Sequence, residues 1–160
     1  MIEHTDPFYL GIEKRIRKEG RQILLVDGDP KHRPFYYTIG NHLKGYPELI
    51  LIGAFKEEFA KAILNMLSEL AQRTSRFEDG QLVRMSKKGL PLQVWDTTMI
   101  AKLEYTRQAT EFYQHSDYAV QQVVVPDPKG RYPADKGCHR RYRVPLLRST
   151  VAIMQSITRH

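Results

Sequence analysis

The chain has 160 residues, of which 41% are hydrophobic and 27% charged, and a net charge of +7. These proportions are typical of a globular protein and exclude a fibrous repeat or wholesale disorder, so we expect one domain over residues 1–160. The longest apolar run, residues 49–55, is far shorter than the roughly 20 residues that cross a bilayer. With a single cysteine and no signal-like N-terminus, the sequence predicts a cytoplasmic protein without membrane contact.

The positive charge is concentrated at the C-terminal end. Residues 126–160 contain eight basic and two acidic residues, and so carry six of the seven net positive charges. Such a basic segment favours an anionic partner, which could be a small molecule, a nucleic acid or an acidic protein surface. The alternative is a segment that only increases solubility.

The first predicted element is a helix that begins at Asp6-Pro7, an N-cap followed by proline, and ends at Gly20. Residues 22–26 are a short β-prone run closed by turn residues 27–30, and they predict a strand.

Two further strands are predicted at residues 35–40 and 49–53, separated by a loop. Residues 49–52 are apolar without alternation, which indicates burial on both faces. An apolar stripe then predicts a helix from Lys56 to about Arg73.

In the second half, strands are predicted at residues 81–85 and 90–96, a helix from Thr97 or Thr98 to about His115, and a buried strand at 118–125. Residues 144–157 fit either an extended segment or a short helix. The order of elements predicts an α+β domain: a mostly antiparallel sheet, or a small split-barrel-like barrel, with two to three helices packed against it.

The sequence gives no metal-binding pattern, because its six histidines form no H-x-H or H-E-x-x-H motif and a CxxC is absent. We therefore expect no metal. Cys138 precedes three arginines, at positions 140, 141 and 143, which would favour a thiolate if the sulfur were at the surface. An incidental free cysteine is the alternative.

The strand and loop from Tyr36 to Glu48 are the densest run of polar and aromatic groups. In a strand, Tyr36 and Thr38 face one side while Phe35, Tyr37 and Ile39 face the other. Asn41, His42 and Glu48 lie in or beside the loop, where a sheet holds functional groups toward a ligand. A hairpin with a buried aromatic strand explains the same residues.

No P-loop or dinucleotide-binding fingerprint is present, so a phosphate would be held instead by arginines of the basic segment. We expect one concave site between the loop and that segment, for an anionic ligand such as a flavin or a nucleotide. Its candidate residues are Tyr36, Thr38, Asn41, His42, Glu48, Asp127, Arg131 and Arg140.

Several of these residues lie in motifs that resemble a known family. FxYTIG at residues 35–40, PEL at 47–49, PDxxGxxP at 126–133 and PLL at 145–147 are similar to the "PFAYTIGL…GxPELI" and "WPDxxGxFPWD…QPxL" segments of a bacterial domain of unknown function. The resemblance implies a bacterial, cytosolic, stand-alone domain and brings no reaction. Asn41, Ala134 and Val144 depart from the family pattern.

Two functions therefore remain open: a small-molecule-binding domain, and a binding module for nucleic acid or an acidic protein through the basic segment. Whether the protein is an enzyme is undecided, although Glu48 or His42 is a candidate general base. Residues 146–157 pack either on this chain's own core or on a second copy in a homodimer.

Overall fold

The computed structural model describes residues 4–148. Its helices and strands follow in the order α1 (Pro7–Glu19), β1 (Gln22–Val26), β2 (Phe35–Ile39), the 3-10 helix η1 (Asn41–Lys44), β3 (Glu48–Ile52), α2 (Glu57–Thr74), β4 (Gln81–Val83), β5 (Leu92–Asp96), α3 (Met99–Tyr105), α4 (Arg107–Tyr113), β6 (Val120–Val124) and the 3-10 helix η2 (Arg140–Tyr142).

The six strands form one sheet in the order β1-β2-β3-β6-β5-β4. Every neighbouring pair is antiparallel except β3 and β6, which are parallel, with Glu48 opposite Val120 and Leu51 opposite Val123. The predicted α+β class and mostly antiparallel sheet are confirmed. The sheet is open, with β1 and β4 at its edges, so the barrel alternative is not the one adopted.

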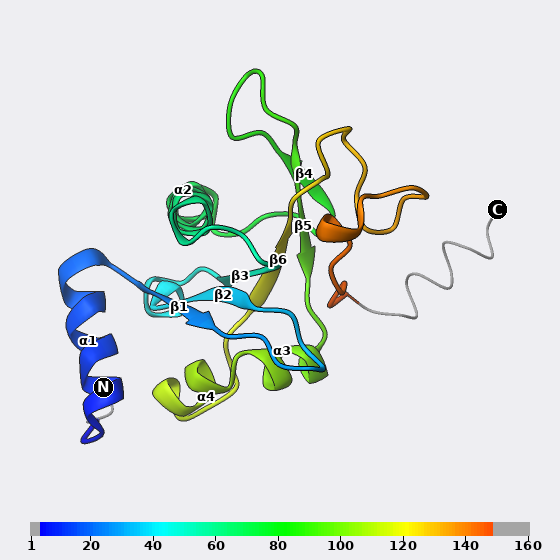
Figure 1. Ribbon diagram of the computed structural model, residues 1–160. Coiled ribbons are helices and arrows are strands. Elements are labelled where there is room, and N and C mark those ends of the chain that lie inside the picture. The colour runs from blue at the N-terminus through cyan, green and yellow to red at the C-terminus, as the bar shows by residue number, and fades with distance from the viewer. Residues whose placement is uncertain (1–3, 149–160) are drawn as a thin grey trace.

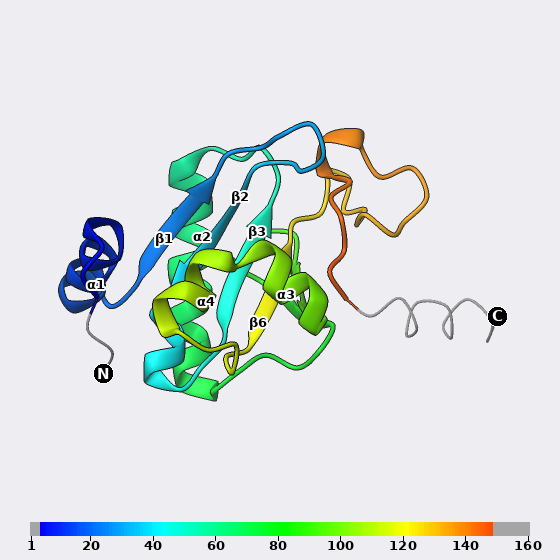
Figure 2. The same ribbon diagram turned by 90° about the horizontal axis from the view of Figure 1, so that it is seen from below.

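Helices cover both faces of the sheet. Helix α2 lies on one face, α3 and α4 lie on the other, and α1 stands beside the edge strand β1 (Figures 1 and 2). All five residues of β3 are buried, which confirms the expected burial on both faces. The parallel strands β3 and β6 are the two central strands of the sheet and are buried along their whole length.

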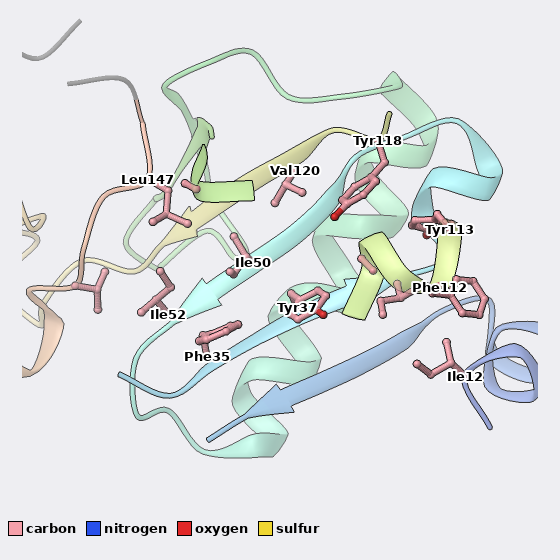
Figure 3. Packing of buried hydrophobic residues seen from close by; sticks show 14 residues of the cluster. Ile12, Phe35, Tyr37, Ile50, Ile52, Phe112, Tyr113, Tyr118, Val120 and Leu147 are labelled. Atoms are coloured by element: carbon pink, nitrogen blue, oxygen red, sulfur yellow. The ribbon is translucent and has the colours of Figure 1, made fainter. Parts of the chain in front are cut away.

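The core has two parts because strand residues alternate between the faces. Figure 3 shows the part under α3 and α4, an apolar cluster to which β2 contributes Phe35 and Tyr37 and α4 contributes Phe112 and Tyr113. The other part lies under α2 and includes Tyr36, Leu49, Leu64, Leu67 and Phe77. Each layer of helices thus has its own apolar contact with the sheet.

The helix start at Asp6 and end at Gly20 are as predicted, with the Asp6 carboxylate accepting from the Phe8 N–H. The single helix predicted from residue 97 or 98 to 115 is instead two. Thr106 leaves the helical region at φ −108° and ψ 47°, and separates α3 from α4. Its hydroxyl group donates to the Lys102 carbonyl, at 2.6 Å, and contacts the Tyr118 hydroxyl. These side-chain bonds stabilise the break, which apolar spacing alone does not reveal.

Beyond β6 the chain is mostly irregular, but β6 holds it in place. The Gln122 side chain donates to the Pro145 carbonyl, at 2.7 Å, and accepts from the Leu147 N–H, at 2.8 Å. Residues 144–147 are neither helix nor strand, and the rest of the 144–157 segment lies outside the described residues. The segment that could pack on a second copy, residues 146–157, lies mostly outside the described residues as well. Among residues 4–148, no helix is both long and apolar enough to cross a membrane.

Candidate functional site

The carboxylate of Glu48, at the start of β3, is completely buried and receives five hydrogen bonds. One oxygen, Oε1, accepts from the Thr38 hydroxyl at 2.7 Å and the Asn41 N–H at 3.2 Å. The other, Oε2, accepts from the N–H groups of Gly40 and His42 and from the Tyr113 hydroxyl. The carboxylate thus fixes the turn between β2 and η1.

This arrangement depends on the backbone of Gly40, whose φ of 123° is in the region that favours glycine. The turn directs three successive N–H groups at one carboxylate, which forms a nest for an anion. Burial raises the pKa of Glu48, while the hydroxyl and N–H donors act in the opposite direction.

Thr38 and Asn41 are also fully buried, and their polar groups are used inside the protein. The Asn41 amide donates to the Ser68 hydroxyl, at 2.8 Å, and to the Pro47 carbonyl, at 3.1 Å. The Thr38 hydroxyl accepts from the Leu49 N–H. Together with Glu48 they form a buried network that holds the loop.

His42 differs from these neighbours because it is half-buried and lines a cavity of about 330 Å³ with Tyr113 and His115. Its ring centroid is 5.4 Å from that of His115. Burial, reinforced by His115, lowers the pKa of His42 and so favours the neutral imidazole.

Tyr36 faces α2, on the other side of the sheet from Tyr37, as the strand alternation predicts. Its hydroxyl donates to the Phe55 carbonyl at 2.9 Å. Tyr36 therefore fixes the chain between β3 and α2.

A second buried carboxylate, Asp127, lies just after the C-terminal end of β6 and is 0% exposed. It accepts from the N–H groups of Lys129, Arg131 and His139 and from Arg131 Nε, all at 2.9 to 3.0 Å. Burial acts to raise the pKa of Asp127, but these donors outweigh it and hold the pKa below its usual value. Asp127 closes the loop from residue 127 to 139.

Cys138 lies inside this closed loop, and is 2% exposed. Its sulfur contacts the carbonyls of Arg131 and His139. Burial raises the pKa of the thiol, and Asp127 adds to the effect. The surface thiolate considered from the sequence is therefore wrong, because the neighbouring arginines do not offset the loss of solvent. Among residues 4–148, no three ligating side chains lie close enough together to hold a metal ion.

The predicted residues are divided between the two ends of β3 and β6, and Tyr36, which is opposite Leu51, lies at the Asp127 end and not with the rest of its loop. Glu48 begins β3, whereas Asp127 follows the end of β6, which runs parallel to it. Figure 2 shows η1, in cyan, at one end of β3 and the orange segment that contains η2 at the other. The single concave site expected between them is therefore not formed.

A large cleft does lie at the Asp127 end. It has a volume of about 600 Å³ and is bounded by α2, the β4–β5 hairpin, the end of β6 and η2. Its lining is mainly apolar, and includes Phe55, Phe59, Met66, Met85, Leu90 and Val125. The Phe55 ring lies 5.5 Å from that of Phe59 and 6.1 Å from that of Tyr142, centroid to centroid.

The charges on this lining are mostly positive. Lys56 and Arg141 are both exposed, whereas the one carboxylate of the described lining, Asp127, has its oxygens occupied by the four bonds given above. Arg33 donates to the carbonyls of Arg140 and Arg141, at 3.2 Å each, and so holds η2 in place beside the cleft. The Arg140 side chain is exposed and is not part of the lining.

Sequence reasoning missed most of the cleft. The apolar stripe that predicts the helix over residues 56–73 includes Phe59 and Met66, yet these two side chains are 44% and 51% exposed. The signal is the width of this stripe: Phe59 and Met66 extend it beyond the buried face of α2, and contiguous exposed apolar residues mark a binding groove. The partner walls come from residues 85–92 and 125–142, and their proximity depends on the sheet order.

Comparison with known proteins gives one match. A model of the family described as a domain of unknown function, DUF4262, matches residues 15–139, so the chain belongs to this family. No curated protein and no solved structure matches the chain.

Proposed function

We propose that this DUF4262 domain binds a small anionic ligand with a planar, apolar body, of the flavin or nucleotide kind. The observation that carries the proposal is the cleft of about 600 Å³, with its aromatic lining and the cations Lys56 and Arg141. Clefts of about 300 to 1,000 Å³ with apolar walls and few polar groups are typical of small-molecule sites.

The position of the cleft in the fold supports the proposal. It opens at the C-terminal ends of the parallel strands β3 and β6, between α2 and the segment after β6. In open α/β sheets with mostly parallel strands, ligands bind in the crevice beyond the carboxyl ends of the strands, and the single parallel pair here offers an edge of the same kind. Loops at the ends of a sheet can change without disturbing the sheet that carries them.

The lining chemistry indicates the ligand class. Phe55, Phe59 and Tyr142 offer ring faces and edges for a planar group. Arg141 and Lys56 supply donors for a phosphate or carboxylate at the rim. The negative charge of the Asp127 carboxylate is offset by the Arg131 guanidinium and by three backbone N–H donors of its own loop. It therefore repels an incoming anion only weakly.

The first test is native mass spectrometry of the purified protein, with an absorbance spectrum before and after denaturation. We expect a stoichiometric extra mass that is released on denaturation, with flavin or nucleotide absorbance. If the protein is purified without ligand, calorimetric titration with FMN and with AMP replaces this test. Absence of saturable binding in both experiments would contradict the proposal.

A pair of variants locates the binding. Ala62 is exposed and lines the cleft, so Ala62→Trp fills it, whereas Gln72→Trp places the same side chain on α2 outside the described lining. We expect Ala62→Trp to weaken binding at least about tenfold, equivalent to about 1.4 kcal/mol, and Gln72→Trp to leave it unchanged. Equal affinities would place the ligand elsewhere.

The second candidate function is binding of nucleic acid or an acidic protein through the basic segment. Arg140, Arg141 and Arg143 are exposed and form no ion pair with a carboxylate of residues 4–148. This function predicts an affinity that falls steeply as salt increases, because each phosphate contact releases counterions. A filter-binding series with single-stranded and duplex DNA in rising salt tests it, and failure to bind at low salt would remove nucleic acid as the partner.

A further inference from the structure

Arg21, between α1 and β1, carries a buried charge without a direct counter-ion. It is 6% exposed, and its guanidinium donates to Asn41 Oδ1 at 2.9 Å, Asn65 Oδ1 at 3.0 Å and the Tyr46 hydroxyl at 3.1 Å. All three acceptors are neutral. No carboxylate of the described chain lies within ion-pair distance of Arg21, although buried charges are usually paired.

Within the protein, the positive charge of Arg21 is balanced by a carboxylate that it does not contact directly, that of Glu48. Asn41 links Arg21 to Glu48, because its side-chain oxygen accepts from Arg21 while its backbone N–H donates to the Glu48 carboxylate. One residue thus separates the two buried charges. A guanidinium has five N–H donors, of which three are used here, so two have no acceptor among residues 4–148.

Arg21 also lines a cleft of about 360 Å³ between α1 and α2. Arg15 of α1 and Lys61 and Asn65 of α2 lie on the same lining. This cleft is on the opposite flank of α2 from Ala62 and Met66, which line the large apolar cleft. The described residues therefore give α2 two clefts of different chemistry, one apolar and one polar.

The surface cations of the polar cleft are held only by exposed ion pairs. Arg15 pairs with Glu19 at 3.1 Å, and Lys61 with Glu57 at 2.9 Å, and every partner is about half exposed. Exposed pairs of this kind contribute little to stability, so an incoming anion competes with them readily. Glu19 and Glu69 also line the cleft, and they disfavour an extended polyanion such as nucleic acid.

We propose that this polar cleft binds the phosphate or carboxylate group of a small molecule. Arg21 forms the floor of the site and donates its two free N–H groups to the oxyanion, as a planar guanidinium does with such groups. Arg15 and Lys61 close over the anion from α1 and α2. The bound group supplies the counter-charge that Arg21 otherwise has only through Asn41.

Titration calorimetry at low ionic strength tests the proposal, with inorganic phosphate as one probe and acetate as the other. The probe that binds with the higher affinity shows whether the cleft recognises a phosphate or a carboxylate group. The double variant Arg15→Gln/Lys61→Gln removes two cations of the cleft, whereas Lys14→Gln/Lys18→Gln removes two exposed cations of α1 that are not on its described lining. Neither variant replaces a buried residue, so both are expected to fold.

We expect the cleft variant to bind at least about tenfold more weakly, a change of about 1.4 kcal/mol, and the control to differ from the wild type by less than about threefold. Unfolding midpoints measured with and without the probe should follow the same order, since a ligand of the native state stabilises it. Equal losses in the two variants would indicate a general charge effect and overturn the site. Absence of saturable binding to both probes would also overturn it.

Discussion

Two fully buried carboxylates lie near the opposite ends of the parallel pair β3 and β6, and they are used differently. Glu48 binds the loop before its own strand, and its donors come from β2, the turn to η1 and α4. Asp127 binds the loop after its strand, and its donors all come from residues 129–139. The first carboxylate joins elements of the core, whereas the second shapes a loop beside an open cleft. A buried carboxylate is therefore not by itself an indication of a ligand site.

The largest effect is expected from Glu48→Ala. This substitution removes the acceptor of five donors, of which all but the Gly40 N–H have no other acceptor among residues 4–148, and should lower the free energy of unfolding by about 3 kcal/mol or more. Urea unfolding measures the loss, with Glu58→Ala, at an exposed position of α2, as the control. A loss below about 1 kcal/mol would show that the network is not a major source of stability.

Asp127→Asn should act mainly on the cleft. The amide cannot accept from all four donors, so the loop that precedes Arg141 and Tyr142 loosens. We expect ligand affinity to fall about tenfold, with a smaller loss of stability than in Glu48→Ala. Asp135→Asn is the matched control, because Asp135 is exposed and accepts from the Tyr132 N–H. Unchanged affinity would separate Asp127 from the function of the cleft.

Tyr113→Phe perturbs the hydrogen-bond network of Glu48 less than Glu48→Ala does. It removes the hydroxyl that donates to Glu48 and accepts from the Gly40 N–H, while keeping the ring. The expected loss is about 1 to 2 kcal/mol in urea unfolding, with no change in the affinity of the apolar cleft. A larger effect on ligand binding than on stability would contradict the separation of the two ends.

The smallest expected effect is a difference in pH dependence. The native pKa of Glu48 is raised above its ordinary 4.5, so its contribution to stability falls as pH rises from about 4.5 toward the native pKa. Asp127 has a lowered native pKa, so its contribution is complete above about 3.8 and is lost as pH falls through the native value. Relative to Glu48→Gln, the wild type should therefore lose stability with rising pH; relative to Asp127→Asn it should gain it. Slopes of the same sign in urea unfolding from pH 2.5 to 7 would contradict this assignment.

The sequence was informative wherever local patterns decide structure. The residues that begin and end helix α1, Asp6 and Gly20, directly flank it in the sequence, and β3 contains a continuous apolar run. Both elements are therefore predicted closely. The break at Thr106 depends on Tyr118, which is distant along the chain, and the parallel pairing of β3 with β6 joins residues about 70 positions apart in the sequence. Local patterns carry no information on either.

The candidate site was predicted less well, for the same reason. Polar residues in a loop indicate function or a buried network equally, and only the partners of Thr38, Asn41 and Glu48 distinguish the two. The apolar cleft is built from side chains of ordinary core type on four separate segments. It becomes recognisable only when the sheet order brings α2, β5 and the end of β6 together.

The most direct test of the account is hydrogen–deuterium exchange of the protein with and without saturating FMN or AMP, whichever binds more tightly. We expect slower exchange in residues 55–66, 85–92 and 125–142, which surround the apolar cleft, and unchanged exchange in residues 38–48. Protection confined to residues 38–48 would contradict the central claim, because it would place the ligand at the Glu48 end of the sheet.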